Sequence, residues 1–193
     1  MKRMFSPFNT FAVVGAGEES QARNVTELFD KIEIEFMESQ FSELATVLVF
    51  AKCVAHIHQT HHWQARGQDF FGDHLMFERV YTSVSEHVDA IAEKTVGAGG
   101  AALVEMTRIA RLVATVTEWM KAIYCSETSV IPSDTDLVRL SLAAEECLVG
   151  ATNYAIMKME SAGTLSKGID NMLSQLVDDR EGASYLLRRA SIC

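Results

Sequence analysis

The stretch from position 62 to position 93 contains five candidate ligands for divalent metal ions: His62, His74, Glu78, Asp89 and Glu93. In a helix, residues four apart project from one face one turn apart, and this spacing joins His74 to Glu78 and Asp89 to Glu93. One or two imidazoles among three carboxylates, without a thiolate, suit iron, manganese or zinc better than a closed structural zinc site. The spacing therefore indicates a metal site, with iron as the leading candidate.

One long predicted helix carries four of these side chains. From Phe70 onward there is no proline before Thr95, and apolar residues recur every three to five positions, at Phe71, Leu75, Val80, Val84, Val88 and Ile91. His74 and Asp89 are 15 residues apart. A rise of about 1.5 Å per residue separates them by roughly 22 Å, so one copy of the helix cannot bring both pairs to one metal ion.

The two pairs share a midpoint, which allows a second copy of the helix to bring them together. Positions 74 and 93 average to 83.5, and so do positions 78 and 89. If two copies cross antiparallel near Ser83 and Val84, the His74 and Glu78 pair of one chain faces the Asp89 and Glu93 pair of the other. The sequence therefore predicts a two-fold dimer with two equivalent sites, each built from both subunits.

The residues around these pairs resemble the Dps family, the miniferritins of bacteria and archaea within the ferritin-like superfamily. The matching residues are His62-Trp63 with Gly67, Phe70-Phe71, His74 with Phe77, Asp89, Ala92-Glu93-Lys94 and Gly99-Gly100. The resemblance covers about Phe41 to Gly100, and it returns more weakly between Gly163 and Arg188. It implies an all-α, ferritin-like four-helix bundle with a helical crossover between the second and third bundle helices.

The resemblance also implies roles for individual residues. Five correspond to ferroxidase ligands, three from one subunit and two from its two-fold mate: His62, His74 and Glu78, then Asp89 and Glu93. Trp63 corresponds to the tryptophan beside the family's iron site. Position 78 departs from the pattern, because family members commonly have Asp there, and the longer Glu78 would alter the geometry of binding.

The activity that the resemblance implies is a ferroxidase reaction. Fe(II) would be oxidised at the inter-subunit site, a pair of ions per site, with hydrogen peroxide or dioxygen as the oxidant, and zinc or manganese could substitute for iron. The two-fold dimers would assemble into a dodecameric hollow shell that stores ferric mineral. We therefore expect an iron storage and detoxification protein of the bacterial or archaeal cytoplasm, active under oxidative stress, with nucleoid association left open.

Two other functions stay open from the sequence. A ferritin-like bundle could bind a partner or DNA through its crossover helix and N-terminal arm, with a metal site that mainly holds the dimer together. A di-metal oxygenase would need Glu-x-x-His motifs inside one bundle, and no suitable helix carries one. A bound metal that cannot turn over would favour the first of these.

Composition and charge restrict the partners. At 193 residues and 48% hydrophobic content, the chain is long enough for one well-buried domain. The net charge is −9, and the first 40 residues carry four basic residues against seven acidic ones. Phosphate binding needs clustered Lys and Arg, so DNA binding through a Lys-rich tail is not expected, although another surface could contact DNA. The longest apolar stretch, 44–55, is too short to span a membrane.

Several residues of chemical interest are expected in the core instead of at a site. Cys53, Cys125, Cys147 and Cys193 lack CxxC spacing, which is typical of a reducing, cytosolic protein. Cys53 and Cys147 are expected to be buried, as are Met106, Met157, Met159 and the Phe residues at helical spacing. His58 lies one turn before His62 and could add to the site, but a core or surface role is the stronger interpretation.

The predicted elements follow from uninterrupted helical patterns, since the chain has only two prolines. The helices are expected to run from Val25 or Glu38 to Ala65, Phe70 to Thr95, Ala101 to Tyr124, Asp134 to Ser161 and Leu165 to Arg189. Residues 1–37 are predicted to be a partly ordered or helical extension, and residues 38–193 the ferritin-like domain. The one strand pattern is Phe11 to Val14.

Three sets of residues are expected to set the helix boundaries. Gly97, Gly99 and Gly100 should end the second helix. Pro132 followed by Ser133-Asp134 should begin the fourth helix, and Gly163 should separate the last two.

Overall fold

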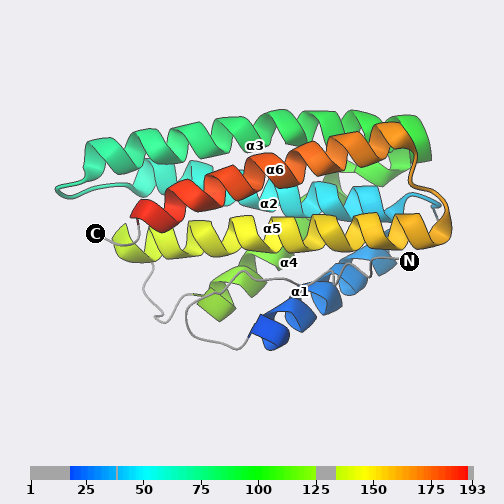
Figure 1. Ribbon diagram of the computed structural model, residues 1–193, viewed down its shortest axis with the longest axis horizontal. Helices are drawn as coiled ribbons and strands as arrows, with labels where there is room; N and C mark the ends of the chain where they lie inside the picture. The colour runs from blue at the N-terminus through cyan, green and yellow to red at the C-terminus, as the bar shows by residue number, and fades with distance from the viewer. Residues whose placement is uncertain (1–17, 38, 125–133, 191–193) are drawn as a thin grey trace, which may run out of the picture.

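The computed structural model is an all-α bundle and describes residues 18–37, 39–124 and 134–190 (Figure 1). Four long helices form the bundle: α2 (Ser42–Gln64), α3 (Phe70–Gly99), α5 (Asp134–Ala162) and α6 (Lys167–Ala190). No strand occurs within the described ranges, and the strand pattern at 11–14 lies outside them. The predicted fold class is confirmed.

Two further helices lie outside the four-helix bundle. α1 (Glu18–Glu33) is followed by the short helix η1 (Ile34–Phe36), and the crossover consists of η2 (Ala101–Val104) and α4 (Met106–Tyr124). In Figure 1, α1 and α4 lie along the same side of the bundle, below α5. The predicted helical crossover is therefore present, whereas the predicted helix start at Pro132 and Ser133 lies outside the described residues.

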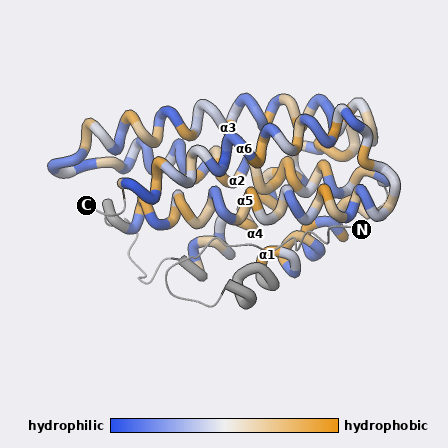
Figure 2. The backbone as a smooth tube through the Cα atoms, in the orientation of Figure 1, coloured by the Kyte–Doolittle hydropathy of each residue, from blue (hydrophilic) through white to orange (hydrophobic). Residues whose placement is uncertain are grey.

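α2 is the central helix of the molecule. Its residues 42–51 are all buried, because α1, α3, α4 and α5 each pack against it. A helix that is apolar on all sides must be covered on all sides, and the additional helices α1 and α4 provide that cover. In Figure 2, by contrast, α3 and α6 alternate between hydrophilic and hydrophobic segments, as expected for helices with one buried face. No helix among the described residues is long and apolar enough to cross a membrane.

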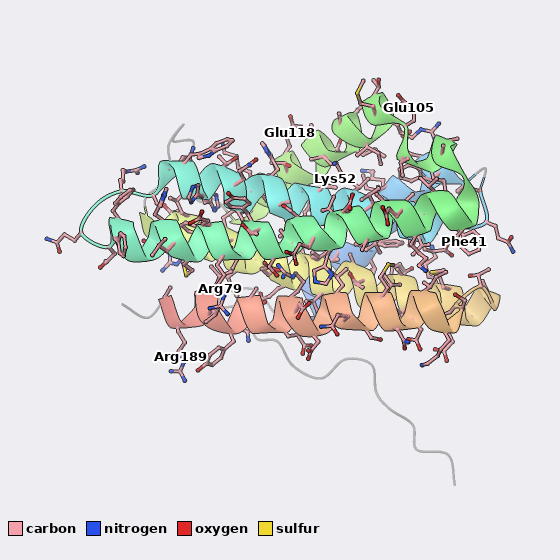
Figure 3. All side chains as sticks on the ribbon, turned by 90° about the horizontal axis from the view of Figure 1, so that it is seen from above. Phe41, Lys52, Arg79, Glu105, Glu118 and Arg189 are labelled. Carbon is pink, nitrogen blue, oxygen red and sulfur yellow. The ribbon has the colours of Figure 1, made fainter. Side chains whose placement is uncertain are left out.

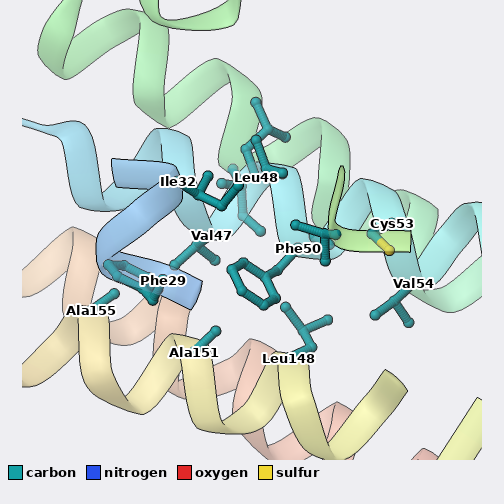
Figure 4. Close-up of a cluster of buried hydrophobic side chains, with 14 of the residues drawn as sticks. Phe29, Ile32, Val47, Leu48, Phe50, Cys53, Val54, Leu148, Ala151 and Ala155 are labelled. Carbon is teal, nitrogen blue, oxygen red and sulfur yellow. The ribbon is translucent and has the colours of Figure 1, made fainter. Parts of the chain in front are cut away.

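The main core joins α1 to α2 and α5 (Figure 4). The Phe29 ring of α1 stacks on Phe50 of α2 with ring centroids 6.2 Å apart, and it meets Tyr154 of α5 edge to face at 5.3 Å. A continuous helix from Val25 to Ala65 would carry Phe29 away from these partners. That alternative is wrong, because α1 ends at Glu33 and α2 begins only at Ser42, and the predicted start at Glu38 is closer to this observed start.

The two glycines at the end of α3 fit their positions for different physical reasons. α3 continues through Gly97 to Gly99, past the predicted end at Thr95. A Cβ on Gly99 would lie 2.3 Å from Leu103 Cδ1, so a larger residue at this position would force the Leu103 side chain of η2 to shift. Gly100 has φ 93°, a left-handed conformation that favours glycine and ends the helix.

Several core predictions are confirmed, and others are wrong. Cys53 and Cys147 are buried, and burial raises the pKa of the Cys53 thiol to about 12. Met159 is fully buried, but Met157 is 42% exposed. Two helical positions differ by about 200° around the axis, so both cannot face the core. Met106, predicted to be buried, is 81% exposed and is the first residue of α4.

A buried acid at the start of α2 generates a stability prediction. Glu43 is 8% exposed, and its Oε2 atom has no hydrogen-bond partner among the described residues. Burial raises the pKa of Glu43, because the charged form loses its hydration. Above that raised pKa the ionised form therefore costs stability, and the cost is relieved as the pH falls toward the unfolded value of 4.5.

We expect Glu43→Gln to increase the free energy of unfolding near neutral pH by about 1 kcal/mol, because Gln carries no charge to desolvate. Urea unfolding at pH 7 and at pH 4 measures the effect, and the gain should shrink at the lower pH. Glu35→Gln is the control: Arg111 lowers the pKa of the exposed Glu35, so this change should not stabilise. A stabilisation by Glu35→Gln, or no stabilisation by Glu43→Gln, would contradict the conclusion that burial of the Glu43 charge costs stability.

Candidate metal site

The α2–α3 hairpin brings two predicted ligands together. α2 ends at Gln64 and α3 begins at Phe70, and Gly67 in the connecting turn has φ 87°. The short turn places His62 near the end of α2 opposite His74 in the second turn of α3. Their imidazole rings stack with centroids 3.8 Å apart.

Reciprocal hydrogen bonds orient both rings. His62 Nδ1 lies 3.0 Å from the His74 carbonyl oxygen, and His74 Nδ1 lies 3.0 Å from the His62 carbonyl oxygen. A carbonyl oxygen can only accept, so each Nδ1 carries the donated hydrogen, and a neutral ring then has its lone pair on Nε2. A metal-binding histidine commonly has this arrangement, with one nitrogen bound to a backbone carbonyl and the other facing the metal.

The three predicted carboxylate ligands are exposed along α3. Glu78 lies one turn after His74, whereas Asp89 and Glu93 lie on the far half of the helix. Glu78 and Asp89 are 11 residues apart, close to three full turns of about 3.6 residues, so they share one face. Among the described residues of a single chain, no three His, Cys, Asp or Glu side chains are grouped where they could hold a metal ion.

Large apolar side chains are exposed around the histidine pair. Trp63 is 67% and Phe71 74% exposed, and Phe70 and Leu75 are also exposed. Phe71 and Leu75 were predicted to face inward, which is wrong: the buried stripe of α3 is Phe77, Val80, Val84, Ile91 and Thr95, on a different face. Clustered exposed apolar residues of this size are typical of an interaction surface. Tyr81, whose ring centroid is 5.4 Å from that of His62, was not predicted at the site.

A buried polar network below this site was also not predicted. It contains side chains from all four bundle helices: His58 and His61 of α2, Ser83 of α3, Ser141 and Glu145 of α5, and Arg180 of α6. The sequence contained a signal for it, because Arg180 continues the apolar stripe of α6 formed by Ile169, Leu173, Leu176, Ala183 and Leu187. A charge at a core position needs a buried partner.

Within this network the histidines have distinct partners. His58 Nε2 donates to Glu145 Oε1 at 2.8 Å, and Ser141 Oγ lies 3.1 Å from His58 Nδ1 and 2.7 Å from His61 Nδ1. Burial lowers the pKa of His61 to about 3, so its ring is neutral at physiological pH. The interpretation of His58 as a core residue therefore agrees with its burial and contacts.

The hairpin contact generates a second prediction. His74→Ala should lower the free energy of unfolding by about 1 kcal/mol, because it removes one hydrogen bond and the ring stacking that join α2 to α3. Urea unfolding measures this loss. The control is His56→Ala, which changes an exposed histidine of α2. A loss from His56→Ala as large as that from His74→Ala would show that the hairpin contact is not the cause.

Comparison with known proteins identifies the family. Residues 53–181 match the family described as ferritin-like domain. The nutrient stress-induced DNA-binding protein of Synechococcus sp. is 28% identical over 106 residues, which are 55% of each chain. The DNA protection during starvation protein of Brevibacillus brevis is 44% identical over 39 residues, 20% of this chain and 26% of that protein. The matched segments thus span about half or less of these relatives.

Solved structures share the fold. An archaeal Dps homologue from Halobacterium salinarum aligns with a TM-score of 0.63 and 16% identity, covering 95% of this chain and 92% of that one. Dps from Thermosynechococcus elongatus aligns with a TM-score of 0.59 and 15% identity, covering 86% and 93%. At this identity the likeness shows the fold alone. The chain belongs to the ferritin-like family, and within that family it is similar to the Dps proteins.

Proposed function

We propose that this protein oxidises Fe(II) at a site shared by two subunits and stores the ferric product inside a hollow assembly. The observation that carries the proposal is the His62 and His74 pair, in which both Nδ1 atoms face backbone carbonyls and both Nε2 lone pairs are left for a metal ion. The similarity of this chain to Dps supports iron as the metal, because the Dps of Vibrio cholerae is described as a member of a superfamily of ferritin-like diiron-carboxylate proteins.

Two copies complete the site in this proposal. With α3 helices crossing antiparallel near Ser83 and Val84, the half-site of one subunit, His62, His74 and Glu78, meets Asp89 and Glu93 of the other. Two features support this arrangement: Glu78 and Asp89 share an exposed face of α3, and the apolar side chains exposed beside the histidines would be covered. The two-fold dimers would then build a dodecameric shell, as the similarity to Dps implies.

Fe(II) enters the reaction as the substrate. A pair of ferrous ions gives up two electrons, and hydrogen peroxide accepts them with two protons to form two water molecules, while dioxygen would be converted to hydrogen peroxide. The five protein ligands supply two neutral imidazoles and three carboxylates, whose negative charge offsets that of the bound cations. The carboxylates would stabilise Fe(III) more strongly than Fe(II), which favours oxidation at this site.

Two residues adjust this site. Glu78 has one methylene more than Asp, so its carboxylate reaches further from α3, and iron geometry or occupancy would differ from a site with Asp. Trp63 is adjacent to His62 and exposed in one subunit, and we place it beside the iron, where a covered indole would limit water access. Zinc or manganese would bind the same nitrogen and oxygen donors as competitors.

Iron storage in the cytoplasm is the proposed physiological role. Two of the relatives are named for DNA binding or DNA protection. This chain, however, has a net charge of −9, and an acidic protein surface repels the phosphate backbone. We therefore do not propose that DNA binding is its main function.

The proposal predicts that oxidation depends on the histidine pair. After anaerobic loading with Fe(II), a hydrogen peroxide pulse should produce ferric absorbance rapidly in the native protein. The double variant His62→Ala, His74→Ala should slow this more than about 10-fold, since even an outer partner of a metal ligand contributes 10- to 100-fold. The control variant His56→Ala, which changes an exposed histidine on the helix of His62, should oxidise iron at the native rate.

Equal and slow oxidation in the native protein and the double variant would overturn the proposal. The site would then be structural, and a ferritin-like protein that binds a partner through its outer layer of α1 and α4 would become the better account.

A further inference from the structure

The bundle core contains an ion pair that stability alone does not explain. Arg180 is 1% exposed and lies 3.2 Å from Glu145 Oε1, and Glu145 is fully buried. Glu145 Oε2 and Arg180 Nε have no hydrogen-bond partner among the described residues. A buried ion pair with incomplete hydrogen bonding generally contributes little net stability, and apolar residues of similar volume often do as well. The pair therefore points to a role in fixing one arrangement of the helices.

The network connects the helices that carry the proposed ligands. Arg180 also donates to Ser83 Oγ at the middle of α3. Through Glu145 it reaches His58 of α2, one turn before His62. The result is a chain of polar contacts from the midpoint of α3, through α6 and α5, to the end of α2 that holds the site.

α3 needs such a link because its contact with α6 is limited. An open pocket of about 540 Å³ lies between the two helices, and Arg79, Ser83, Arg180 and Tyr185 are among the residues that line it. Figure 3 shows Arg79 of α3 on the side that faces α6. A second polar contact joins the two helices nearer the surface, between His87 Nε2 and Asp179 Oδ2 at 2.8 Å. Arg180 thus adds a polar connection on the buried side, beside the apolar cluster that contains Phe77 and Val80 of α3 with Ala183 and Leu187 of α6.

Ser83 is also the residue about which the ligand pairs are arranged. Positions 74 and 93, and positions 78 and 89, are both centred on 83.5. A shift of α3 would move His74 relative to His62, and a tilt of α3 about this point would move Glu78 and Asp89 in opposite directions relative to a second copy. Anchoring α3 at its midpoint controls both halves of the site at once.

We infer that Arg180 is a positioning residue for the shared metal site: it anchors the midpoint of α3 to α5 and, through Glu145 and His58, to α2, which fixes the ligand geometry. The inference rests on the proposed function and assigns no contact between Arg180 and the metal.

Two pairs of variants test this in the full-length protein. Ser83→Ala removes only the last contact of the network, and Ser85→Ala is its control, because Ser85 bonds to Tyr81 of its own helix. Arg180→Met removes the charge but keeps a long side chain, and Arg188→Met is its control, since Arg188 also pairs α6 with α5, through Glu146 Oε1 at 2.7 Å. Cobalt(II) alone serves as the probe, because its visible spectrum reports coordination geometry.

We expect Ser83→Ala and Arg180→Met to weaken cobalt binding by about 10-fold, a loss typical of removing a contact to a metal ligand. The visible spectrum of the bound cobalt should change as well. Both controls should bind as the native protein does. Amide hydrogen exchange without metal should become faster at residues 80–87 in the two network variants only. Native cobalt affinity and spectrum in Ser83→Ala and Arg180→Met would overturn the inference.

Failure of the proposed function gives a different result. If His62→Ala, His74→Ala binds cobalt as the native protein does, the shared site is wrong. Amide hydrogen exchange without metal then decides whether Arg180 anchors α3. Exchange at residues 80–87 in Ser83→Ala and Arg180→Met that matches the native protein would overturn the inference by itself.

Discussion

The length of α3 is the constraint on which the rest of this structure depends. Its proposed ligands lie in two groups about 22 Å apart along the helix axis, and a rigid helix cannot close that distance. Within one chain the described residues bring His62 and His74 together and leave Asp89 and Glu93 exposed on the far half of α3. A complete site therefore needs a second helix, and the common midpoint at 83.5 is consistent with a second copy of the same helix.

Several separate features of the chain support a fixed α3. The short turn at Gly67 sets the hairpin, and the reciprocal bonds between His62 and His74 orient the imidazoles. The first half of α2, residues 42–51, is buried beneath other helices, which gives the hairpin a rigid base. The polar network at Arg180 adds a contact at the midpoint of α3. Rigid, preorganised supports of this kind are what a metal site with ligands from two chains requires.

The sequence predicted the helices and the fold class, because periodic apolar spacing and glycine positions are local signals. It failed where local pattern and tertiary packing differ. Met106 and Phe71 are apolar and at helical spacing, yet both are exposed: Met106 is the first residue of α4, and Phe71 lies on the face of α3 opposite its buried stripe. The break between α1 and α2 depends on tertiary packing, because the Phe29 ring of α1 contacts Phe50 of α2 and Tyr154 of α5. The candidate ligands were predicted from residue type, spacing and the resemblance to Dps, whereas the hydrogen bonds that orient His62 and His74 join two helices and have no sequence pattern.

Mixing two inactive variants tests the shared site most directly. One variant carries His62→Ala and His74→Ala, and the other carries Asp89→Ala and Glu93→Ala. In a mixed dimer, one of the two sites receives all its native ligands and the other keeps only Glu78. If the variants are refolded together and pair at random, about a quarter of all sites should be intact, and ferrous oxidation should recover to about a quarter of the native rate. A mixture as inactive as either variant alone would contradict a site built from two subunits.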